Sequence, residues 1–466
     1  MRNSELVQEI RGVMTRFEPL TPEFVAAIAE DGLTYGEVED ILVAHGLDIS
    51  KVVCDPTRKV FGVYYADYEL GQYATLVLQR DYLQGIGQAE LRKLESYGGL
   101  CPRLLQKDWK NYYFIDVPLA MAIYDFERRY REIPKEQVFS VWHRIYKRID
   151  YGTGMWLTEV IDYVLRKAPP PVKLPDADPD GLITIYRGMG ELSQPPDRAI
   201  SWSSHPGNAL WFAIRSGQEN RIAVARVKPE QIVAYFGTFA DENEVLVLPG
   251  TIQDYRFERM IPATATTVPM LVEPVLLDYQ WYGRMAKNLG YHMEGNPFQV
   301  HGLGHILRVL LLTLLYAQHS EENLSETERK ILIYFALLHD IGRTNEDRDD
   351  RHGEQSVALI QQKNIRLPGM RLSRKEYQIA HMIIANHCLD DTIGEATFMA
   401  ASWLSLKEKA RAIYLYRICK DMDGLDRVRF NGLDYRLLRT EYAKQLPLIA
   451  GCLLEEDMLA VLDAEL

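Results

Sequence analysis

The sequence predicts an α+β protein of more than one domain, and three observations carry this prediction. The chain has 466 residues, which exceeds the roughly 100–200 residues typical of a single domain. Short runs rich in β-branched and aromatic residues gather within residues 182–275, whereas apolar residues follow helical spacing before and after them. Hydrophobic residues make up 47% and charged residues 25% of the chain, a composition typical of folded globular proteins.

The first region, residues 1–167, is expected to be mostly helical. Apolar residues recur at three- and four-residue spacing in Leu119–Arg131 and Gln137–Lys147. Val60–Gln79 is rich in Tyr and Val and is expected to contain strands instead. The N-terminal run MRNSELVQEIRGVMTRF lacks the apolar core of a signal peptide and predicts an amphipathic helix. Residues 168–181 contain five prolines, so a linker or long loop is predicted there.

The next region, residues 182–275, is predicted to be a β-rich core of five to seven strands. Turn residues separate the runs LITIYRG, AISWSS, RIAVARV, QIVAYFG and NEVLVLPG, and a helical stretch, Pro206–Ser216, follows the second run. Residues 285–466 are predicted to form an all-α domain. Within it, LSET precedes a helix that leads into ALLHD, with Ser325 as the N-cap.

Charge and cysteine content restrict the function classes. The net charge is 53 − 65 = −12, which argues against generic binding to nucleic acid or an anionic membrane. The five cysteines form no C-x-x-C pair, which favours a reducing compartment over a disulfide framework. The most apolar run, Val309–Ala317, is shorter than the roughly 20 residues of a membrane span. We expect a cytoplasmic protein without a membrane span, and a translocated effector is the alternative.

Histidines are concentrated in the C-terminal part, where eight of the 11 lie. Five of these eight occur in HGLGHILRV, LLHDIGR, RHGEQS and IIANH, followed by the acidic run KDMDGLDR. His339 and Asp340 end an apolar helical run, and a buried imidazole and carboxylate are costly unless they are paired or bind a metal. Imidazole and carboxylate ligands together suit Mn, Fe, Ni, Zn or Mg. The pattern therefore predicts a divalent metal site.

This ordered set resembles the HD superfamily of metal-dependent phosphohydrolases over about residues 290–466. The resemblance implies an all-α HD fold that hydrolyses a nucleotide or another phosphate ester, with Asp340 as a catalytic residue. Asp423 matches the distal ligand better than Asp421, because the family places that ligand just before a small residue and Leu. The implied ligands of one metal are His305, His339, Asp340 and Asp423.

Two-metal members of this superfamily add a His after the HD doublet and a His-His pair. His352 and His387 match these positions, but Cys388 stands where the second His of the pair would be. A second metal and a direct substrate contact therefore both remain open for these residues. His301 and Arg343 are further candidates for the same two roles.

Three motifs of the β-rich region also suggest chemistry. Arg187 in YRGM ends one strand run, SWSS ends another, and DENEVLVLP carries Glu242 and Glu244. Residues i and i+2 of a strand point to the same face, so both carboxylates are expected to face one cleft. An arginine fork suits a phosphate, and a carboxylate stabilises an oxocarbenium-like centre.

In this order the motifs resemble the Arg–Ser–Glu class of ADP-ribosyltransferases over about residues 183–248. In that class Glu244 would stabilise the cation as nicotinamide leaves NAD, and Glu242 would assist the incoming nucleophile. Trp202 stands where Thr is usual, and Gly237–Asp241 takes the place of the substrate-recognition loop. The residues implied to bind NAD are Arg187, Ser201 and Ser203.

Together the two resemblances predict a bifunctional enzyme. It would transfer ADP-ribose from NAD to a protein side chain, with arginine favoured, or to a small-molecule acceptor, and it would hydrolyse a nucleotide or phosphate ester. One alternative is an HD phosphohydrolase whose N-terminal part only binds NAD or a partner. Another is a nucleotide-sensing regulator without catalysis, although the intact charged groups argue against it.

Overall fold

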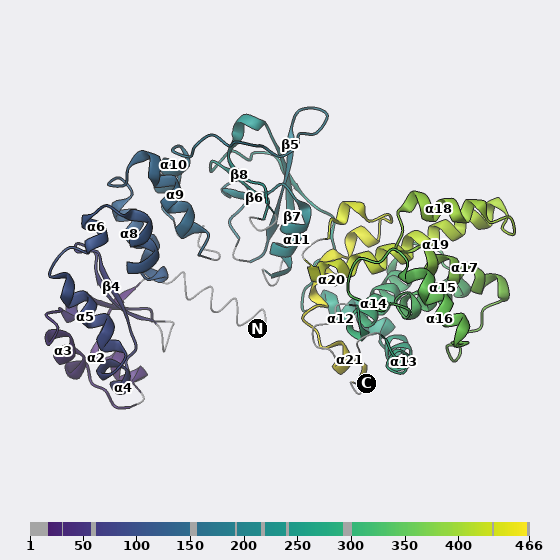
Figure 1. Cartoon of the computed structure of the whole chain (residues 1–466), viewed down its shortest axis with the longest axis horizontal. Helices are drawn as coiled ribbons and strands as arrows, with labels where there is room; N and C mark the ends of the chain where they lie inside the picture. Colours follow the sequence, from purple (N-terminus) through teal and green to yellow (C-terminus); the bar gives the residue numbers. More distant parts are fainter. Residues whose placement is uncertain are drawn as a thin grey trace. The chain divides into compact units, whose positions relative to one another are not determined.

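A computed structural model of the chain divides into two compact units. Figure 1 labels helices and strands of the chain. The first unit comprises Met1–Ile183, Leu192–Trp202 and Val227–Asp254, and the second comprises Thr184–Glu191, Ser203–Arg226 and Tyr255–Leu466. The helix predicted at the N-terminus lies, apart from Phe17, outside the described residues. The structure describes residues 17–29, 31–56, 62–149, 156–191, 193–215, 220–238, 242–291, 301–430 and 433–463.

The first unit begins with a four-stranded antiparallel sheet in the order β1-β2-β3-β4. Its strands are β1 (Glu18–Pro19), β2 (Val52–Cys54), β3 (Val63–Asp67) and β4 (Gln72–Leu76). The strands expected within Val60–Gln79 are confirmed as β3 and β4. All five residues of β3 are buried, so helices and loops cover both faces of this strand.

Helices make up most of the rest of the first unit, as predicted. The aromatic side chains of Phe126 and Trp142 are fully buried in its core. Residues 168–181 form neither helix nor strand, which agrees with the predicted loop. The α-helices described in this unit are α2 (Pro22–Ile28), α3 (Tyr35–Val43), α4 (Arg80–Gln84), α5 (Gly87–Tyr97), α6 (Pro102–Leu105), α7 (Trp109–Asn111), α8 (Leu119–Arg129), α9 (Lys135–Tyr146) and α10 (Thr158–Leu165).

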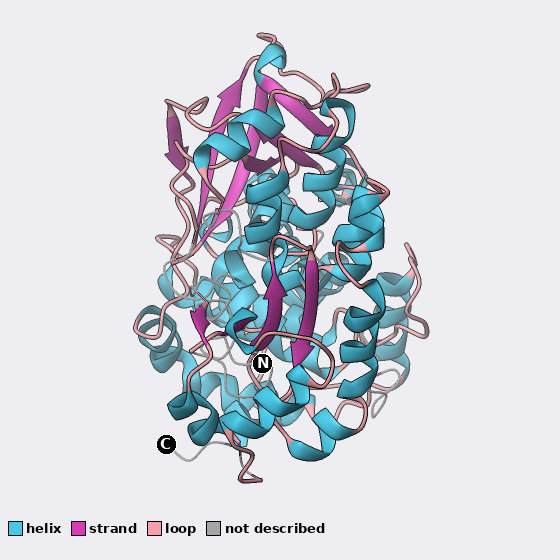
Figure 2. Ribbon diagram, turned by 90° about the vertical axis from the view of Figure 1, so that its left-hand side faces the viewer, coloured by secondary structure: helices cyan, strands magenta, loops and turns pink. Residues whose placement is uncertain are grey.

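The predicted β-rich region forms strands of a second antiparallel sheet (Figure 2). In the first unit the order is β6-β9-β8, and in the second unit it is β10-β7-β5. A side chain at Gly188 would collide with the carbonyl oxygen of Ala209, so glycine lets α11 (Pro206–Arg215) pack closely on β5. The strands are β5 (Ile183–Met189), β6 (Ser201–Ser203), β7 (Arg221–Val227), β8 (Ile232–Phe236), β9 (Glu244–Val247) and β10 (Tyr255–Phe257).

One detail of this sheet corrects the sequence prediction. Strand β9 begins at Glu244, and Glu242 lies in the preceding turn with a φ of 61°. Asn243 also has a positive φ, of 49°, so the backbone reverses locally instead of continuing as a strand. The prediction that Glu242 and Glu244 share one face of a strand is therefore wrong.

The C-terminal part of the second unit is helical among its described residues, as predicted. One core contains the fully buried rings of Tyr316, Phe335 and Tyr416. Its α-helices are α12 (Thr267–Val272), α13 (Leu276–Ala286), α14 (Leu303–His319), α15 (Glu326–Leu338), α16 (His352–Gln362), α17 (Arg374–Asn386), α18 (Asp391–Ala400), α19 (Leu406–Leu425), α20 (Pro447–Cys452) and α21 (Met458–Asp463). Short 3-10 turns follow α19, namely η7 (Asp426–Phe430), η8 (Tyr435–Leu437) and η9 (Ala443–Gln445).

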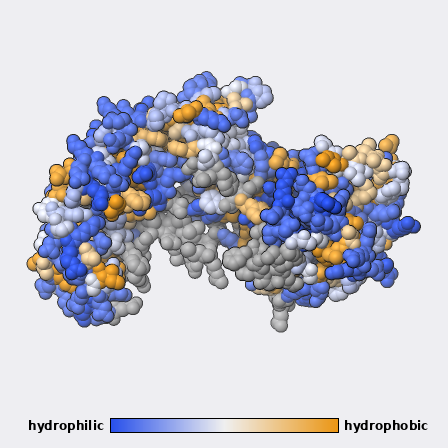
Figure 3. Space-filling model, viewed as in Figure 1, coloured by the Kyte–Doolittle hydropathy of each residue, from blue (hydrophilic) through white to orange (hydrophobic). Residues whose placement is uncertain are grey.

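The surface drawn in Figure 3 is mainly hydrophilic, with apolar side chains in scattered groups. Among the described residues, none of the helices combines the length and the hydropathy that a bilayer crossing requires.

Candidate metal centre

The HD doublet lies at the end of α15 because this helix has a strong start and a long buried run. The Ser325 hydroxyl accepts the backbone N–H of Glu328, and the Glu328 carboxylate accepts the backbone N–H of Ser325. This reciprocal cap confirms the predicted N-terminus of the helix. Helix α15 ends at Leu338. The next two residues, His339 and Asp340, are 0% and 3% exposed. The doublet is therefore held inside the helical core, as the sequence predicted.

The loop after the doublet is fastened to the start of α16. Backbone N–H of Gly342 donates to the Ser356 hydroxyl over 2.9 Å, and that hydroxyl donates to the carbonyl of His339 over 2.7 Å. A Cβ atom at Gly342 would lie 2.3 Å from the backbone nitrogen of Ser356. Only glycine permits this approach, which brings α16 and His352 next to the doublet.

Four histidines form two facing pairs around the doublet. In the first pair, Nε2 of His305 on α14 lies 3.1 Å from Nε2 of His339. In the second pair, Nε2 of His352 at the start of α16 lies 2.9 Å from Nε2 of His387 at the end of α17. All four side chains are buried. The structure thus brings together residues that are up to 82 positions apart, 387 − 305, in the sequence.

Asp340 lies between these pairs and turns one carboxylate oxygen toward each. Its Oδ1 atom lies 3.2 Å from Nε2 of His352 and 3.7 Å from Nε2 of His387. Its Oδ2 atom lies 3.7 Å from Nε2 of His305 and 3.9 Å from Nε2 of His339. No hydrogen-bond partner of Oδ1 is found among the described residues. A buried, unsatisfied carboxylate oxygen beside imidazole nitrogens is the donor arrangement that a metal ion would complete.

Asp423 of α19 completes the first group. Its Oδ1 atom lies 3.3 Å from Nε2 of His305 and 3.8 Å from Nε2 of His339. Asp421 has a different task, because it accepts the backbone N–H groups of Arg439 and Thr440. The geometry therefore places Asp423, and not Asp421, beside the histidine pair.

The outer ring nitrogens indicate which inner nitrogens carry a lone pair. Nδ1 of His305 lies 2.7 Å from a carboxylate oxygen of Asp426, and Nδ1 of His387 lies 2.7 Å from the carbonyl oxygen of Ile384. Nδ1 of His339 faces the carbonyl oxygen of Ala336 at 3.2 Å. These acceptors assign the proton to Nδ1 and the lone pair to Nε2. Converging lone pairs repel one another unless a cation lies between them, so this donor set fits a divalent metal.

The electrostatics keep the acids ionised. Burial raises the pKa of Asp340, but His339, His352 and His387 prevail and hold this pKa well below its ordinary value. Burial also raises the pKa of Asp423, but His305 and His339 lower it below its ordinary range. A carboxylate must be ionised to bind a metal, so both acids are in the required state near neutral pH.

The two histidines of the first pair differ. Burial lowers the pKa of His339 to about 4, so this ring is neutral near pH 7. Burial and Arg429 also lower the pKa of His305, but the carboxylates of Asp423 and Asp426 outweigh them and raise it above its ordinary value. Without a metal, His305 is therefore the ring that carries the extra proton. That proton removes the repulsion between the Nε2 lone pairs of His305 and His339.

Cys388 lies next to the second histidine pair. Its Sγ atom and ring nitrogens of His352 and His387 all lie within 4.8 Å of one another. Burial raises the pKa of this thiol, which donates to the carbonyl oxygen of Asp350 at 3.2 Å. The residue that departs from the family pattern is thus placed where a ligand of a second metal would be.

A cavity of about 700 Å³ opens onto this centre, and Asp340, His352, His387 and Asp423 lie in its wall. His301 also lines it, with Nδ1 at 2.7 Å from Glu346. Arg343 is buried, and its guanidinium donates to the carbonyl of Asp347 over 2.7 Å and lies 3.1 Å from Nδ1 of His352. The cationic side chains of the wall are Arg343, Arg348, Lys420, Arg427, Arg429 and Arg439. Its acidic side chains are Asp340, Glu346, Asp347, Asp349, Asp350, Asp423 and Asp434. Individual arginines, and not a net positive charge, therefore suit a phosphate-bearing substrate.

Sequence reasoning missed Asp426, which orients His305. The Asp426 carboxylate also accepts from Arg308 and, over 2.8 Å, from Arg429. The signal was present in KDMDGLDR, because Asp426 follows Asp423 by three residues and lies one helical turn away. A metal-ligating histidine commonly donates its other ring N–H to a carboxylate, and Asp426 has this role toward His305.

The second predicted site centres on Glu244, which is 3% exposed. Its Oε1 atom accepts the Ser201 hydroxyl over 2.8 Å and the Tyr146 hydroxyl over 2.7 Å. Its Oε2 atom lies 3.9 Å from Nε2 of His143, whose ring stacks on Phe236. Burial raises the pKa of Glu244, but His143, Tyr146 and Ser201 prevail and lower it. Sequence reasoning did not anticipate His143 or Tyr146, which α9 supplies. Tyr146 lies 98 residues before Glu244 in the sequence.

The other residues of the predicted NAD site lie as follows. Arg187 is half-buried on β5, in the second unit. Ser203 is buried at the end of β6, where its hydroxyl accepts the backbone N–H of His205 over 3.0 Å. Residues 239–241 of the predicted substrate-recognition loop lie outside the described residues.

Comparison with known proteins gives one match. Residues 302–428 match the family model of the HD domain, and this range includes all the implied ligands from His305 to Asp423. No curated protein and no solved structure matches the chain, and an ADP-ribosyltransferase domain finds no support. HD domains bind divalent metals, and the clusters described above have suitable ligands. Residues 302–428 are therefore an HD domain, which indicates a metal-dependent phosphohydrolase.

Proposed function

We propose that the HD domain hydrolyses a nucleotide or another phosphate ester at a centre for two divalent metal ions. One observation carries this proposal: Asp340 turns Oδ1 toward one histidine pair and Oδ2 toward the other, at 3.2–3.9 Å. A carboxylate in this position suits a ligand shared by two ions. Bound divalent ions activate water and neutralise phosphate charge.

The two groups of ligands differ in chemistry. His305, His339, Asp423 and Oδ2 of Asp340 form the first group, which contains only nitrogen and oxygen donors. The second group contains His352, His387, Oδ1 of Asp340 and the sulfur of Cys388. Thiolate ligands favour Zn or Fe over Mg or Mn. We therefore propose that the second group selects a softer metal than the first.

The remaining residues bind the substrate. Arg343 is buried beside His352 and offers a fixed guanidinium, while the exposed Arg427 can move to meet the substrate. Both would contact phosphate oxygens by charge-assisted hydrogen bonds. Lys420 is paired with Asp391 at 2.7 Å, so this carboxylate offsets part of the positive charge that it brings to the wall. His301, held by Glu346, would contact the substrate from the other side of the doublet.

The test is a hydrolysis screen over nucleotides, cyclic nucleotides and simple phosphate esters, with Mn²⁺, Fe²⁺, Zn²⁺ or Mg²⁺ added. We expect metal-dependent release of phosphate or of a nucleotide product. Asp340→Asn should lose more than about 100-fold in rate, which exceeds the 10–100-fold typical of losing an outer partner of a ligand. Asp278→Asn, an exposed residue of α13, is the matched control. Equal rates in the two variants would refute the proposal.

We also propose, as a second activity, ADP-ribosyl transfer from NAD by the β-rich region. The supporting observation is the arrangement of Glu244, a buried ionised carboxylate that binds the hydroxyl of Ser201. Such a carboxylate can accept ribose hydroxyls and stabilise an oxocarbenium-like centre. Glu244 would be catalytic, Glu242 in its turn would assist the acceptor, and Arg187, Ser201 and Ser203 would bind NAD.

Labelled NAD tests the transferase separately from the hydrolase. The full-length protein with candidate acceptors should release nicotinamide and transfer the label, and Glu244→Gln should abolish both. Asp340→Asn should leave the transfer unchanged, since it lies in the HD domain. If NAD binds without turnover, the N-terminal part is a binding module beside an HD phosphohydrolase. Binding of nucleotides without either reaction would favour the regulator.

A further inference from the structure

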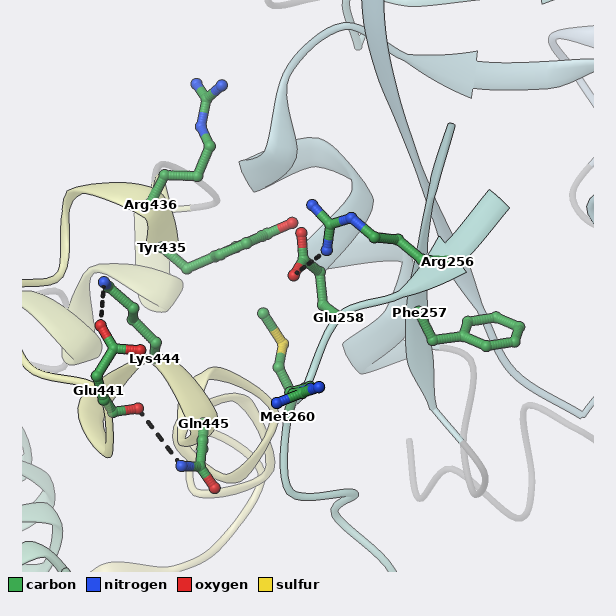
Figure 4. Close-up of a pocket in the computed structure, with 10 residues that line it drawn as sticks. Arg256, Phe257, Glu258, Met260, Tyr435, Arg436, Glu441, Lys444 and Gln445 are labelled. Carbon is green, nitrogen blue, oxygen red and sulfur yellow. Dashed lines mark hydrogen bonds and ion pairs between the residues drawn. The ribbon is translucent and has the colours of Figure 1, made fainter. Parts of the chain in front are cut away.

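The second unit contains another cavity, of about 750 Å³, outside the metal centre (Figure 4). One wall is the segment 256–260, which begins in β10, and the other is formed by residues of η8 and η9. None of its lining residues belongs to the metal centre or to the Glu244 cluster. Its size is within the roughly 300–1,000 Å³ of small-molecule sites.

Charge in this cavity is opposite to that of the chain. Four cations and two carboxylates line it, whereas the whole chain has a net charge of −12. Arg436 is neutralised by Asp434, which leaves three cations against the two carboxylates. Arg256 binds Glu258 over 3.1 Å and Lys444 binds Glu441 over 2.7 Å. The Arg256 side chain is 67% exposed and that of Glu441 is 88% exposed. Their partners Glu258 and Lys444 are 19% and 37% exposed. Ion pairs with one exposed member are weak, so a phosphate group could compete with either carboxylate.

A buried hydroxyl supplies the second observation. Tyr435 is only 4% exposed, and its hydroxyl has no hydrogen-bond partner within the part of the chain that the structure describes. Figure 4 shows this hydroxyl pointing across the cavity toward Arg256 and Glu258. An unsatisfied buried hydroxyl is costly, and a ligand oxygen would remove that cost.

Arg436, the neighbour of Tyr435, is held rigidly. It donates to Asp434 over 2.7 and 2.9 Å and to the hydroxyl of Tyr186 over 3.0 Å. The backbone that carries Tyr435 is thereby fixed before any ligand binds. Preorganised donors of this kind reduce the entropic cost of binding.

We propose that this cavity is a second phosphate-binding site for a nucleotide-sized ligand. Arg256, Arg259 and Lys444 bind the phosphate oxygens, and the Tyr435 hydroxyl donates one further hydrogen bond. The site is independent of the proposed hydrolase and transferase, because it shares no side chain with either. Its second wall nevertheless continues into the metal cavity, since Leu437, Leu438 and Arg439 line that cavity.

The test measures binding by calorimetry on full-length Asp340→Asn protein in chelator, with pyrophosphate, ATP and adenosine as probes. Pyrophosphate and ATP should bind and adenosine should not, because the site recognises phosphate. Arg256→Glu with Arg259→Glu should weaken binding of both anions at least tenfold. Tyr435→Phe, which keeps the buried ring, should weaken it about three- to tenfold.

The matched control makes the same change of charge elsewhere, at two exposed positions, as Arg92→Glu with Lys407→Glu. It should bind both anions with the parent affinity. The proposal is overturned if the parent binds neither anion, if adenosine binds as well as ATP, or if the pocket variants keep the affinity of the control. Tyr435→Phe decides the matter alone if the double charge reversal does not fold.

Discussion

Two buried carboxylates of this protein have contrasting environments. Asp340 and Glu244 are each 3% exposed. Asp340 meets four imidazoles, and its Oδ1 atom lacks a hydrogen-bond donor among the described residues. Glu244 directs Oε1 to two hydroxyls of its own chain, at 2.7 and 2.8 Å. The unsatisfied oxygen of Asp340 lies among imidazole nitrogens, which suits a cation. Glu244 has one oxygen held by two hydroxyls, and its other oxygen, Oε2, also lacks a hydrogen-bond partner among the described residues.

Metal removal should give the largest effect, and it should distinguish these two carboxylates. A ligand at 1,000 times its Kd stabilises the folded state by about 4 kcal/mol. We expect this difference in unfolding free energy between metal-loaded and chelator-treated wild-type protein. Asp340→Asn should show almost none of it, because both metal groups lose a shared ligand, whereas Glu244→Gln should retain it. Denaturant unfolding with and without chelator measures the effect. If metal stabilised Asp340→Asn as much as wild type, Asp340 would not be the carboxylate on which metal binding depends.

A change next to the first metal group should have a smaller effect. Asp426 accepts from Nδ1 of His305 over 2.7 Å, and it therefore holds the ring in the tautomer that a metal requires. Asp426→Asn should lower metal affinity at that group about 10–100-fold. Competition with a chromophoric chelator measures the affinity, and Asp278→Asn serves again as the control. An unchanged affinity would show that Asp426 only satisfies the neighbouring arginines.

The smallest effect concerns Glu244 and depends on pH. The pKa of Glu244 is lower in the folded state than in the unfolded state, where it is about 4.5. The ionised Glu244 carboxylate therefore stabilises the fold above pH 4.5. This stabilisation is lost as the pH falls through the folded-state pKa. Tyr146→Phe removes one donor and should cost about 1 kcal/mol at neutral pH. The difference from wild type should shrink below pH 4.5 as the carboxyl becomes protonated.

Urea unfolding at a series of pH values measures this difference. Tyr163→Phe on α10 controls for the loss of a tyrosine hydroxyl in the same unit. A gap that stays constant across this pH range would mean that the Tyr146 hydroxyl does not stabilise the ionised carboxylate.

Much of the HD centre was predictable because most of its candidate ligands lie near the ends of helices. His339 and Asp340 end a buried apolar helix whose start is marked by Ser325, and the resemblance to the HD family distinguished Asp423 from Asp421. Asp426 was missed because its role depends on contact with His305, 121 residues earlier. The run KDMDGLDR marks Asp426 as a carboxylate three residues after Asp423, but it does not identify His305 as its partner.

The Glu244 region was less predictable for two physical reasons. Glu242 has a left-handed backbone, which alternation of residue types does not reveal. Tyr146 and His143 reach Glu244 from a helix that sequence reasoning treated as a separate region. The strands of the β-rich region, by contrast, were predicted well, because β-branched runs and turn residues mark them locally.

The central claim, that Asp340 is shared by two metal ions, is tested most directly by elemental analysis of the full-length protein. The protein should be purified with Mn, Fe and Zn supplied and compared with Asp340→Asn prepared in the same way. We expect two ions per wild-type chain and nearly none in the variant. A wild-type protein without bound metal, or a variant that keeps both ions, would contradict it.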